Sequence, residues 1–141
     1  MKEEYFFKVA ELTSKLSTCA SIEVGAVLVR DKRIIATGYN GVASGKKHCK
    51  EIFSDTFDRE THHTWSIENE LHAEENLIAV CAKNGIQTKD AKLYLTVSPC
   101  ITCAKIILAA GILEVNYSKE YDKDSRGIKF LKDNGVKCLK K

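Results

Sequence analysis

Two short motifs of this 141-residue chain contain residue types that could do chemistry together. The first is His72-Ala73-Glu74, and the second is Pro99-Cys100-Ile101-Thr102-Cys103. One imidazole and two thiolates are a recognised ligand set for a zinc ion that keeps its fourth position open for water. Zinc lowers the pKa of such a water from about 15.7 toward about 7, and the Glu74 carboxylate would move its proton. The two motifs therefore predict a hydrolytic zinc site.

The sequence around each motif predicts that it begins a helix. Residues 91–97 have the apolar and β-branched pattern of a buried strand, and Pro99 suits the first turn of a helix that continues to residue 110. Cys100 and Cys103 would share one face of that helix at its N-terminus, where the helix dipole favours thiolate. His72 would likewise begin a helix, and Asn84-Gly85 is a typical helix end.

Two other kinds of site are alternatives. A CxxC motif at a strand-to-helix turn is also typical of a thiol oxidoreductase. A structural zinc module would use the same cysteines, but its protein ligands would fill all four positions and leave Glu74 without a role. Neither alternative accounts for the H-x-E motif as well as a catalytic site does.

At these motifs the chain resembles the zinc-dependent cytidine and deoxycytidylate (dCMP) deaminases, whose signature is H-x-E followed by P-C-x-x-C. It is similar to phage-type dCMP deaminases also at residues 24–27, 38–41, 69–76 and 117–122. The resemblance implies hydrolysis of dCMP to dUMP and ammonia, with Glu74 carrying the protons. A bifunctional dCMP/dCTP deaminase, or a deaminase of another cytosine or adenine substrate, is the alternative within this chemistry.

The resemblance also implies which residues bind the substrate. Asn40 would contact the sugar, and the backbone N–H of Ala73 would hold the pyrimidine O2. A carbonyl near Ser98 would accept from the amino group, and Tyr121 would line the nucleotide pocket. Independently of the resemblance, a local excess of basic residues could bind a nucleotide phosphate, with an ordinary solvated helix face as the alternative: Lys119, Lys123, Arg126, Lys129 and Lys132.

A second metal site is expected in residues 41–71. This stretch has poor periodicity and contains Cys49 and three of the four histidines, His48, His62 and His63. A structural zinc ion would hold a connection that is too long to be stable by packing alone. The resemblance places its ligands at Cys19, Cys49, His62 and Glu70, and His48 or His63 could replace Glu70.

The resemblance further implies an effector nucleotide at residues 38–50. The backbone at Gly38, Gly41 and Val42 and the side chains of Lys46 and Lys47 would contact its phosphates. Relatives of this type are activated by dCTP with Mg²⁺, inhibited by dTTP and assembled as homohexamers, and the same is expected here.

The predicted elements are those of an α/β protein with one domain over residues 1–141. Strands are expected at 24–30, 33–39, 91–97, 113–117 and 136–139, and helices at 2–18, 72–84, 100–110 and 125–134. The first two strands must be antiparallel because only Asp31 and Lys32 join them. The later strands alternate with helices, which predicts a mixed five-stranded sheet flanked by helices. The resemblance implies the same three-layer α/β/α arrangement, the cytidine deaminase-like fold.

Composition argues against several other classes. The net charge is only +3, and the 22 basic residues are scattered among 19 acidic ones, which does not predict a nucleic-acid surface. No apolar run is long enough for a membrane span. The first residues look like a helix with a core-facing stripe of Tyr5, Phe6, Val9, Leu12 and Leu16, and not like a secretory signal. We therefore expect reduced cysteines and a cytoplasmic location.

Overall fold

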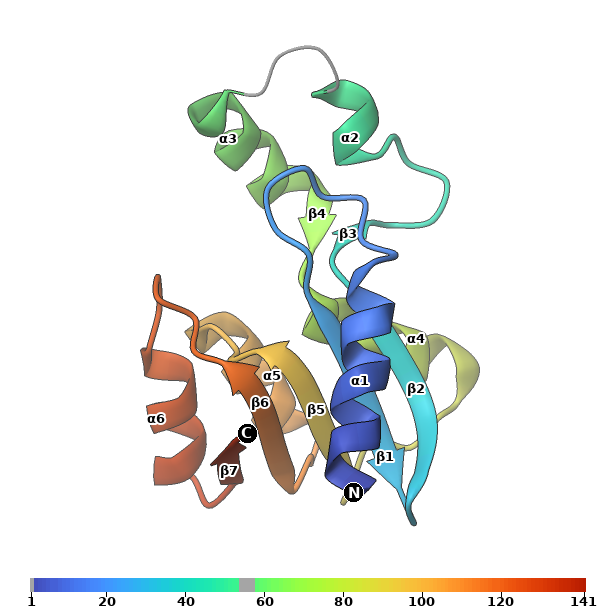
Figure 1. Ribbon diagram of the computed structural model, residues 1–141, viewed down its shortest axis with the longest axis vertical. Helices are drawn as coiled ribbons and strands as arrows, with labels where there is room; N and C mark the ends of the chain where they lie inside the picture. The colour runs from blue at the N-terminus through green and yellow to red at the C-terminus, as the bar shows by residue number, and fades with distance from the viewer. Residues whose placement is uncertain (1, 54–57) are drawn as a thin grey trace.

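The computed structural model describes residues 2–53 and 58–141, and its centre is a sheet of five strands (Figure 1). The strands are β1 (Gly25–Arg30), β2 (Arg33–Tyr39), β5 (Lys92–Val97), β6 (Glu114–Lys119) and β7 (Lys137–Lys140). Their order is β2-β1-β5-β6-β7. Strand β1 is antiparallel to β2 and β5, whereas β5, β6 and β7 are parallel. The predicted mixed sheet is confirmed.

The turn between the first two strands follows from its residues. Asp31 and Lys32 both have positive φ angles, 51° and 64°. A two-residue hairpin turn of this kind twists in the same sense as the strands that it joins, and Asp tolerates the conformation better than most residues. The turn sets the register of β1 on β2, in which Arg30 pairs with Arg33.

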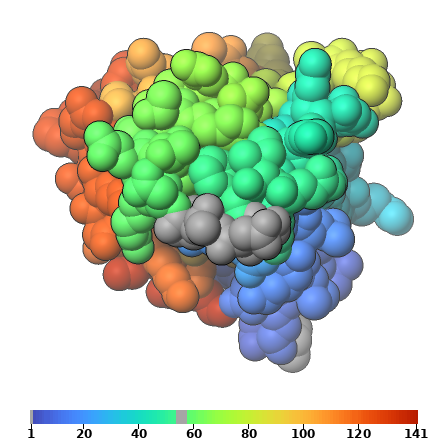
Figure 2. Space-filling view, turned by 90° about the horizontal axis from the view of Figure 1, so that it is seen from above, coloured from blue at the N-terminus to red at the C-terminus, as the bar shows by residue number. Residues whose placement is uncertain are grey.

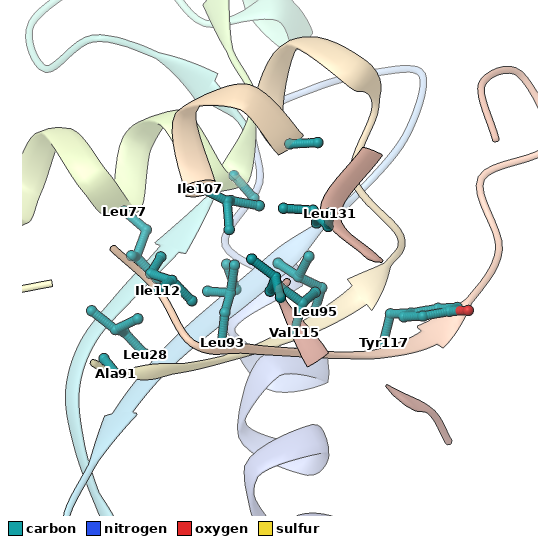
Figure 3. Close-up of a cluster of buried hydrophobic side chains, with 14 of the residues drawn as sticks. Leu28, Leu77, Ala91, Leu93, Leu95, Ile107, Ile112, Val115, Tyr117 and Leu131 are labelled. Atoms are coloured by element: carbon teal, nitrogen blue, oxygen red, sulfur yellow. The ribbon is translucent and has the colours of Figure 1, made fainter. Parts of the chain in front are cut away.

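Helices cover both faces of the sheet. Helix α1 (Lys2–Ser14) lies on one face, and α4 (Ala73–Asn84), α5 (Ile101–Ala109) and α6 (Arg126–Asp133) lie on the other (Figure 1). Figure 3 shows side chains of these three helices, Leu77, Ile107 and Leu131, in one cluster with the leucines of the strands. No helix within the described ranges is both long and apolar enough to cross a membrane.

The predicted apolar stripe of α1 is wrong in part. Tyr5, Leu12 and Leu16 are 57%, 71% and 62% exposed. The face that packs on the sheet instead contains Phe6, Phe7 and Ala10, which contact Tyr94 and the valines of β1. Two adjacent faces of this helix are apolar, so periodicity alone could not decide which of them is buried.

Residues 41–53 and 58–71 form a separate layer above one end of the strands (Figure 1). The structure has a helix, α3 (Arg59–Asn69), in a stretch where the sequence predicts only a loop. Asp58 caps α3 by accepting from the backbone N–H of Thr61, but few apolar side chains mark its buried face. Helix α3 lies beside the short α2 (Cys49–Ile52), as Figure 2 shows from above. Below them β3 (Gly41–Val42) pairs with β4 (Glu70–Leu71), which leads directly to His72.

Candidate active site and metal centres

The three predicted catalytic zinc ligands meet where two helices begin. His72 is the N-cap residue of α4, and Cys100 is the N-cap residue of α5. The Nδ1 atom of His72 lies 3.2 Å from the Sγ atom of Cys103 and 3.6 Å from that of Cys100. All three ligand atoms lie within 4.8 Å of one another. The structure therefore brings the two motifs together as the sequence predicts.

Hydrogen bonds among the three side chains shift the pKa of each one. Hydrogen bonds from Cys103 and then His72 lower the pKa of Cys100 to about 4, so Cys100 is a thiolate at neutral pH. The pKa of Cys103 is raised, chiefly because its thiol donates to Cys100. The same thiolate raises the pKa of His72 to about 9. A bound metal ion would displace these shared protons, and one nitrogen and two sulfur donors are a set that suits zinc.

Glu74 stands beside this cluster without belonging to it. Its side chain is buried, with 5% of its surface exposed, and it lines the same pocket as His72 and Cys100. Burial raises the pKa of Glu74 to about 7. A carboxyl group with that pKa can both accept and return a proton near neutral pH, which is what general acid and base catalysis needs.

A pocket of about 80 Å³ adjoins the cluster. Its walls include all four residues that the resemblance assigns to the substrate: Asn40, Ala73, Ser98 and Tyr121. Ala73 is the first residue of α4, so no carbonyl within the helix accepts its backbone N–H. This N–H is therefore available to a ligand oxygen in the pocket.

Hydrogen bonds hold the pocket walls in place. The Asn40 amide accepts from Val24 N–H and donates to Ile22 O, both at 2.8 Å. An amide has two donor hydrogens and two lone pairs, so Asn40 still has one of each for a sugar hydroxyl. On the opposite wall, the Ser98 hydroxyl oxygen accepts from the backbone N–H of Tyr121 at 2.8 Å.

Three apolar residues complete the pocket: Ile22, Val24 and Val97. The sequence predicts no role for these three residues. They lie in or beside β1 and β5, where an apolar residue is expected whether or not a ligand binds. No signal in one sequence separates such a wall from ordinary core.

A second group of four ligand atoms is found at Cys19, Cys49, His62 and Glu70. The Nε2 atom of His62 lies 3.1 Å from Cys49 Sγ, 3.7 Å from Cys19 Sγ and 3.4 Å from Glu70 Oε1. The structure thus brings together the four residues that the resemblance named. The alternative ligands lie outside the group, since His63 is exposed and His48 is exposed beside Glu51.

The second group fits a metal ion for a reason beyond its composition. Its four side chains are buried, and burial raises the pKa of Cys19 to about 11. The Oε2 atom of Glu70 is buried and has no hydrogen-bond partner within the described residues. An unpartnered buried carboxylate oxygen is unfavourable, and a cation beside it would remove that penalty.

The residues expected to bind an effector lie in three different elements: β2, β3 and the loop after β3. A side chain at Gly38 would meet the Ala73 carbonyl oxygen at 2.6 Å, so this glycine lets α4 approach β2 closely. Gly41 and Val42 form β3, and Lys46 and Lys47 are exposed on the loop that follows. The effector site stays a prediction.

An open cleft of about 810 Å³ continues from the small pocket. The two cavities share Ile22, Asn40, His72 and Tyr121. Besides His72, three exposed basic residues line the cleft: Arg59, His63 and Lys123. Three glutamates, Glu60, Glu70 and Glu75, line the cleft too.

Comparison with known proteins agrees with this geometry. Residues 1–119 match the family described as the cytidine and deoxycytidylate deaminase zinc-binding region. The chain is 35% identical to the deoxycytidylate deaminase of Enterobacteria phage T2, over 90% of this chain and 85% of that protein. It is 42% identical to ComE operon protein 2 of Bacillus subtilis over 84% of this chain, and spans 59% of that protein's length.

A solved structure is similar over nearly the whole chain. It is the dCMP deaminase from the cyanophage S-TIM5 in complex with dCMP and dUMP. The TM-score is 0.83 at 34% identity, and the match covers 99% of this chain and 96% of that one.

Proposed function

Because this chain belongs to the cytidine and deoxycytidylate deaminase zinc-binding family, we propose that it is a zinc-dependent deaminase that hydrolyses dCMP to dUMP and ammonia. The observation that carries the proposal is the small pocket in which the buried Glu74 faces the same space as His72 and Cys100. The similarity to phage deoxycytidylate deaminases over most of both chains supports dCMP as the substrate.

Each residue of the site has a separate role in the proposed reaction. His72, Cys100 and Cys103 would hold a zinc ion, which would supply the Lewis acid that activates water. Glu74 takes up a proton and delivers it to the ring and to the departing ammonia, which its pKa of about 7 allows at neutral pH. The Ala73 N–H orients the pyrimidine oxygen, and the buried walls keep bulk water away from the ring.

The cleft beside the pocket supports a nucleotide over a nucleoside. A pyrimidine in the small pocket would direct its 5′-phosphate into the cleft, where Arg59 and Lys123 are exposed. Neither side chain is in an ion pair among residues 2–53 and 58–141, so both can bind an anion. The cleft is open enough for a longer phosphate chain, which makes dCTP the second candidate substrate.

The second group of ligands has a structural role in this proposal. Cys19, Cys49, His62 and Glu70 would hold a zinc ion with four protein ligands and no position for water. Homohexamer assembly, control by dCTP and dTTP with Mg²⁺, and a cytoplasmic location remain predictions from the family resemblance.

Ammonia release tests the proposal. Cytidine, deoxycytidine, dCMP and dCTP are compared as substrates, with the wild-type protein and Glu74→Gln side by side. We expect the highest kcat/KM with dCMP, and loss of turnover in Glu74→Gln with unchanged zinc content. Full turnover in Glu74→Gln would show that the role given to Glu74 is wrong. A wild-type protein that releases ammonia from none of the four compounds would refute the proposed reaction.

A further inference from the structure

The connection from β6 to α6 wraps around the turn that contains Cys100. Ser98 N–H donates to Lys119 O at 2.8 Å, and Ser98 Oγ accepts from Tyr121 N–H at 2.8 Å. Farther along, a side chain at Gly127 would lie 2.1 Å from the Pro99 carbonyl oxygen, so α6 begins in direct contact with the turn. The connection therefore touches both a zinc ligand's turn and the substrate pocket.

Asp124 makes a side-chain hydrogen bond from this connection to α5. Its Oδ2 atom accepts from the backbone N–H of Ile101, the residue after Cys100, at 3.0 Å. Its own backbone N–H donates to Tyr121 O at 3.4 Å. A single aspartate thus joins the first turn of α5 to the backbone of a residue that lines the pocket.

Arg126 holds the Asp124 carboxylate in this position. Its Nε and Nη2 atoms donate to Oδ1 at 2.9 Å and to Oδ2 at 3.1 Å, a bidentate pair, and its backbone N–H donates to Oδ1 at 3.1 Å. The Asp124 side chain is only 11% exposed, whereas that of Arg126 is 73% exposed. The guanidinium group keeps the pKa of Asp124 well below its usual value, so the carboxylate is charged throughout the neutral range.

We propose that Asp124 is a positioning residue for the deaminase site, one that fixes the Cys100 turn and the Tyr121 wall relative to each other. The inference rests on the proposed function for its kinetic part only. Asp124 lies outside the pocket and outside both ligand groups, so it acts through the backbone of Ile101 and Tyr121 and not on the substrate. Loss of its carboxylate would free the first turn of α5 from the connection that carries Tyr121.

The test compares Asp124→Asn with Asp133→Asn. Asp133 is a matched control because it pairs with Lys129 on the exposed side of α6, and no hydrogen bond or ion pair within the described residues joins its side chain to α5 or to Tyr121. In Asp124→Asn we expect about tenfold faster loss of zinc to a chelator, the effect of losing one hydrogen bond to a charged group. With zinc saturating, KM for dCMP rises by about the same factor while kcat stays within about threefold. Backbone hydrogen exchange of residues 98–103 and 118–125 becomes faster.

Asp133→Asn should match the wild type in all three measurements. Arg126→Ala provides a second variant if Asp124→Asn does not fold, and should shift zinc loss and KM in the same direction by less, because the bond to Ile101 remains. Equal zinc loss and equal exchange in Asp124→Asn and Asp133→Asn would overturn the proposal. A lower kcat at unchanged KM in Asp124→Asn would also overturn the proposal, because a purely structural role would lower the fraction of active protein without changing KM. If no cytosine compound is deaminated, the proposed function is wrong, while zinc loss and exchange still decide the role of Asp124.

Discussion

Replacing Cys49 with alanine tests whether the second ligand group holds a metal ion that the fold needs. Cys49 is fully buried, and its Sγ atom lies 3.1 Å from His62 Nε2. It also accepts from the backbone N–H of Ala20 at 3.0 Å, beside Cys19. The substitution therefore removes one of four ligands and a contact between two segments far apart in the sequence.

The size of the effect follows from the burial of the group. Removing one member of a buried charged pair costs about 3–5 kcal/mol, because the remaining groups stay buried without compensation. For a domain near this size, each 1 kcal/mol lowers Tm by about 2–4 °C. We therefore expect Tm of Cys49→Ala to fall by roughly 6–20 °C. Zinc content should fall by one equivalent per chain.

The assay combines metal analysis with thermal unfolding, each with and without a chelator. Cys81→Ala is the matched control, since Cys81 is equally buried in α4 but belongs to neither ligand group. Its cavity should lower Tm without changing the zinc content. A wild-type zinc content in Cys49→Ala would show that the second group holds no metal ion, and a lower zinc content with a wild-type Tm would show that the fold does not need it.

Three further predictions concern other parts of the molecule. Gly38→Ala should lower stability by about 1–3 kcal/mol, because its Cβ would lie 2.8 Å from that of Leu77, and a wild-type Tm would contradict this. Burial raises the pKa of Tyr94 to about 12, so the folded state favours the neutral phenol. The free energy of unfolding therefore falls as pH rises from about 10 to about 12. Urea unfolding of Tyr94→Phe should then depend less on pH in that range, and equal slopes would count against it. Lys123→Ala should raise KM about two- to fivefold for dCMP but not for deoxycytidine, with Lys129→Ala as the control.

The sheet and its order could be largely predicted because its signals are local. The hairpin at Asp31 and Lys32 fixes one antiparallel pair, and alternation of strands and helices after residue 91 fixes the parallel part. Helix α3 could not be predicted in the same way. Its buried side is set by His62 and by ring contacts of Trp65 and Phe53, with centroids 5.7 Å apart, and not by a periodic apolar stripe.

Some residues of the site could likewise be predicted from the sequence, and others could not. His72, Glu74 and the two cysteines could be predicted because their chemistry is unusual for the positions they occupy, each at the start of a helix. Ile22 and Val97 line the same pocket but could not be predicted, since apolar residues beside a strand need no ligand to explain them. The contact of Asp124 with Ile101 joins residues 23 positions apart and depends on how α6 packs on α5, which the sequence alone does not specify.

The two ligand groups are joined by a very short stretch of chain, so the layer of residues 41–53 and 58–71 is attached directly to the active site. Glu70 belongs to one group and His72 to the other, with only Leu71 between them. Leu71 pairs with Gly41, the residue after Asn40, so the pocket wall is attached to the same two-stranded ribbon. On the other side, Ser17 accepts from Cys19 N–H at 3.2 Å and donates to Asn40 O at 2.8 Å. The second group therefore closes the base of this layer at the points from which Asn40 and His72 enter the site.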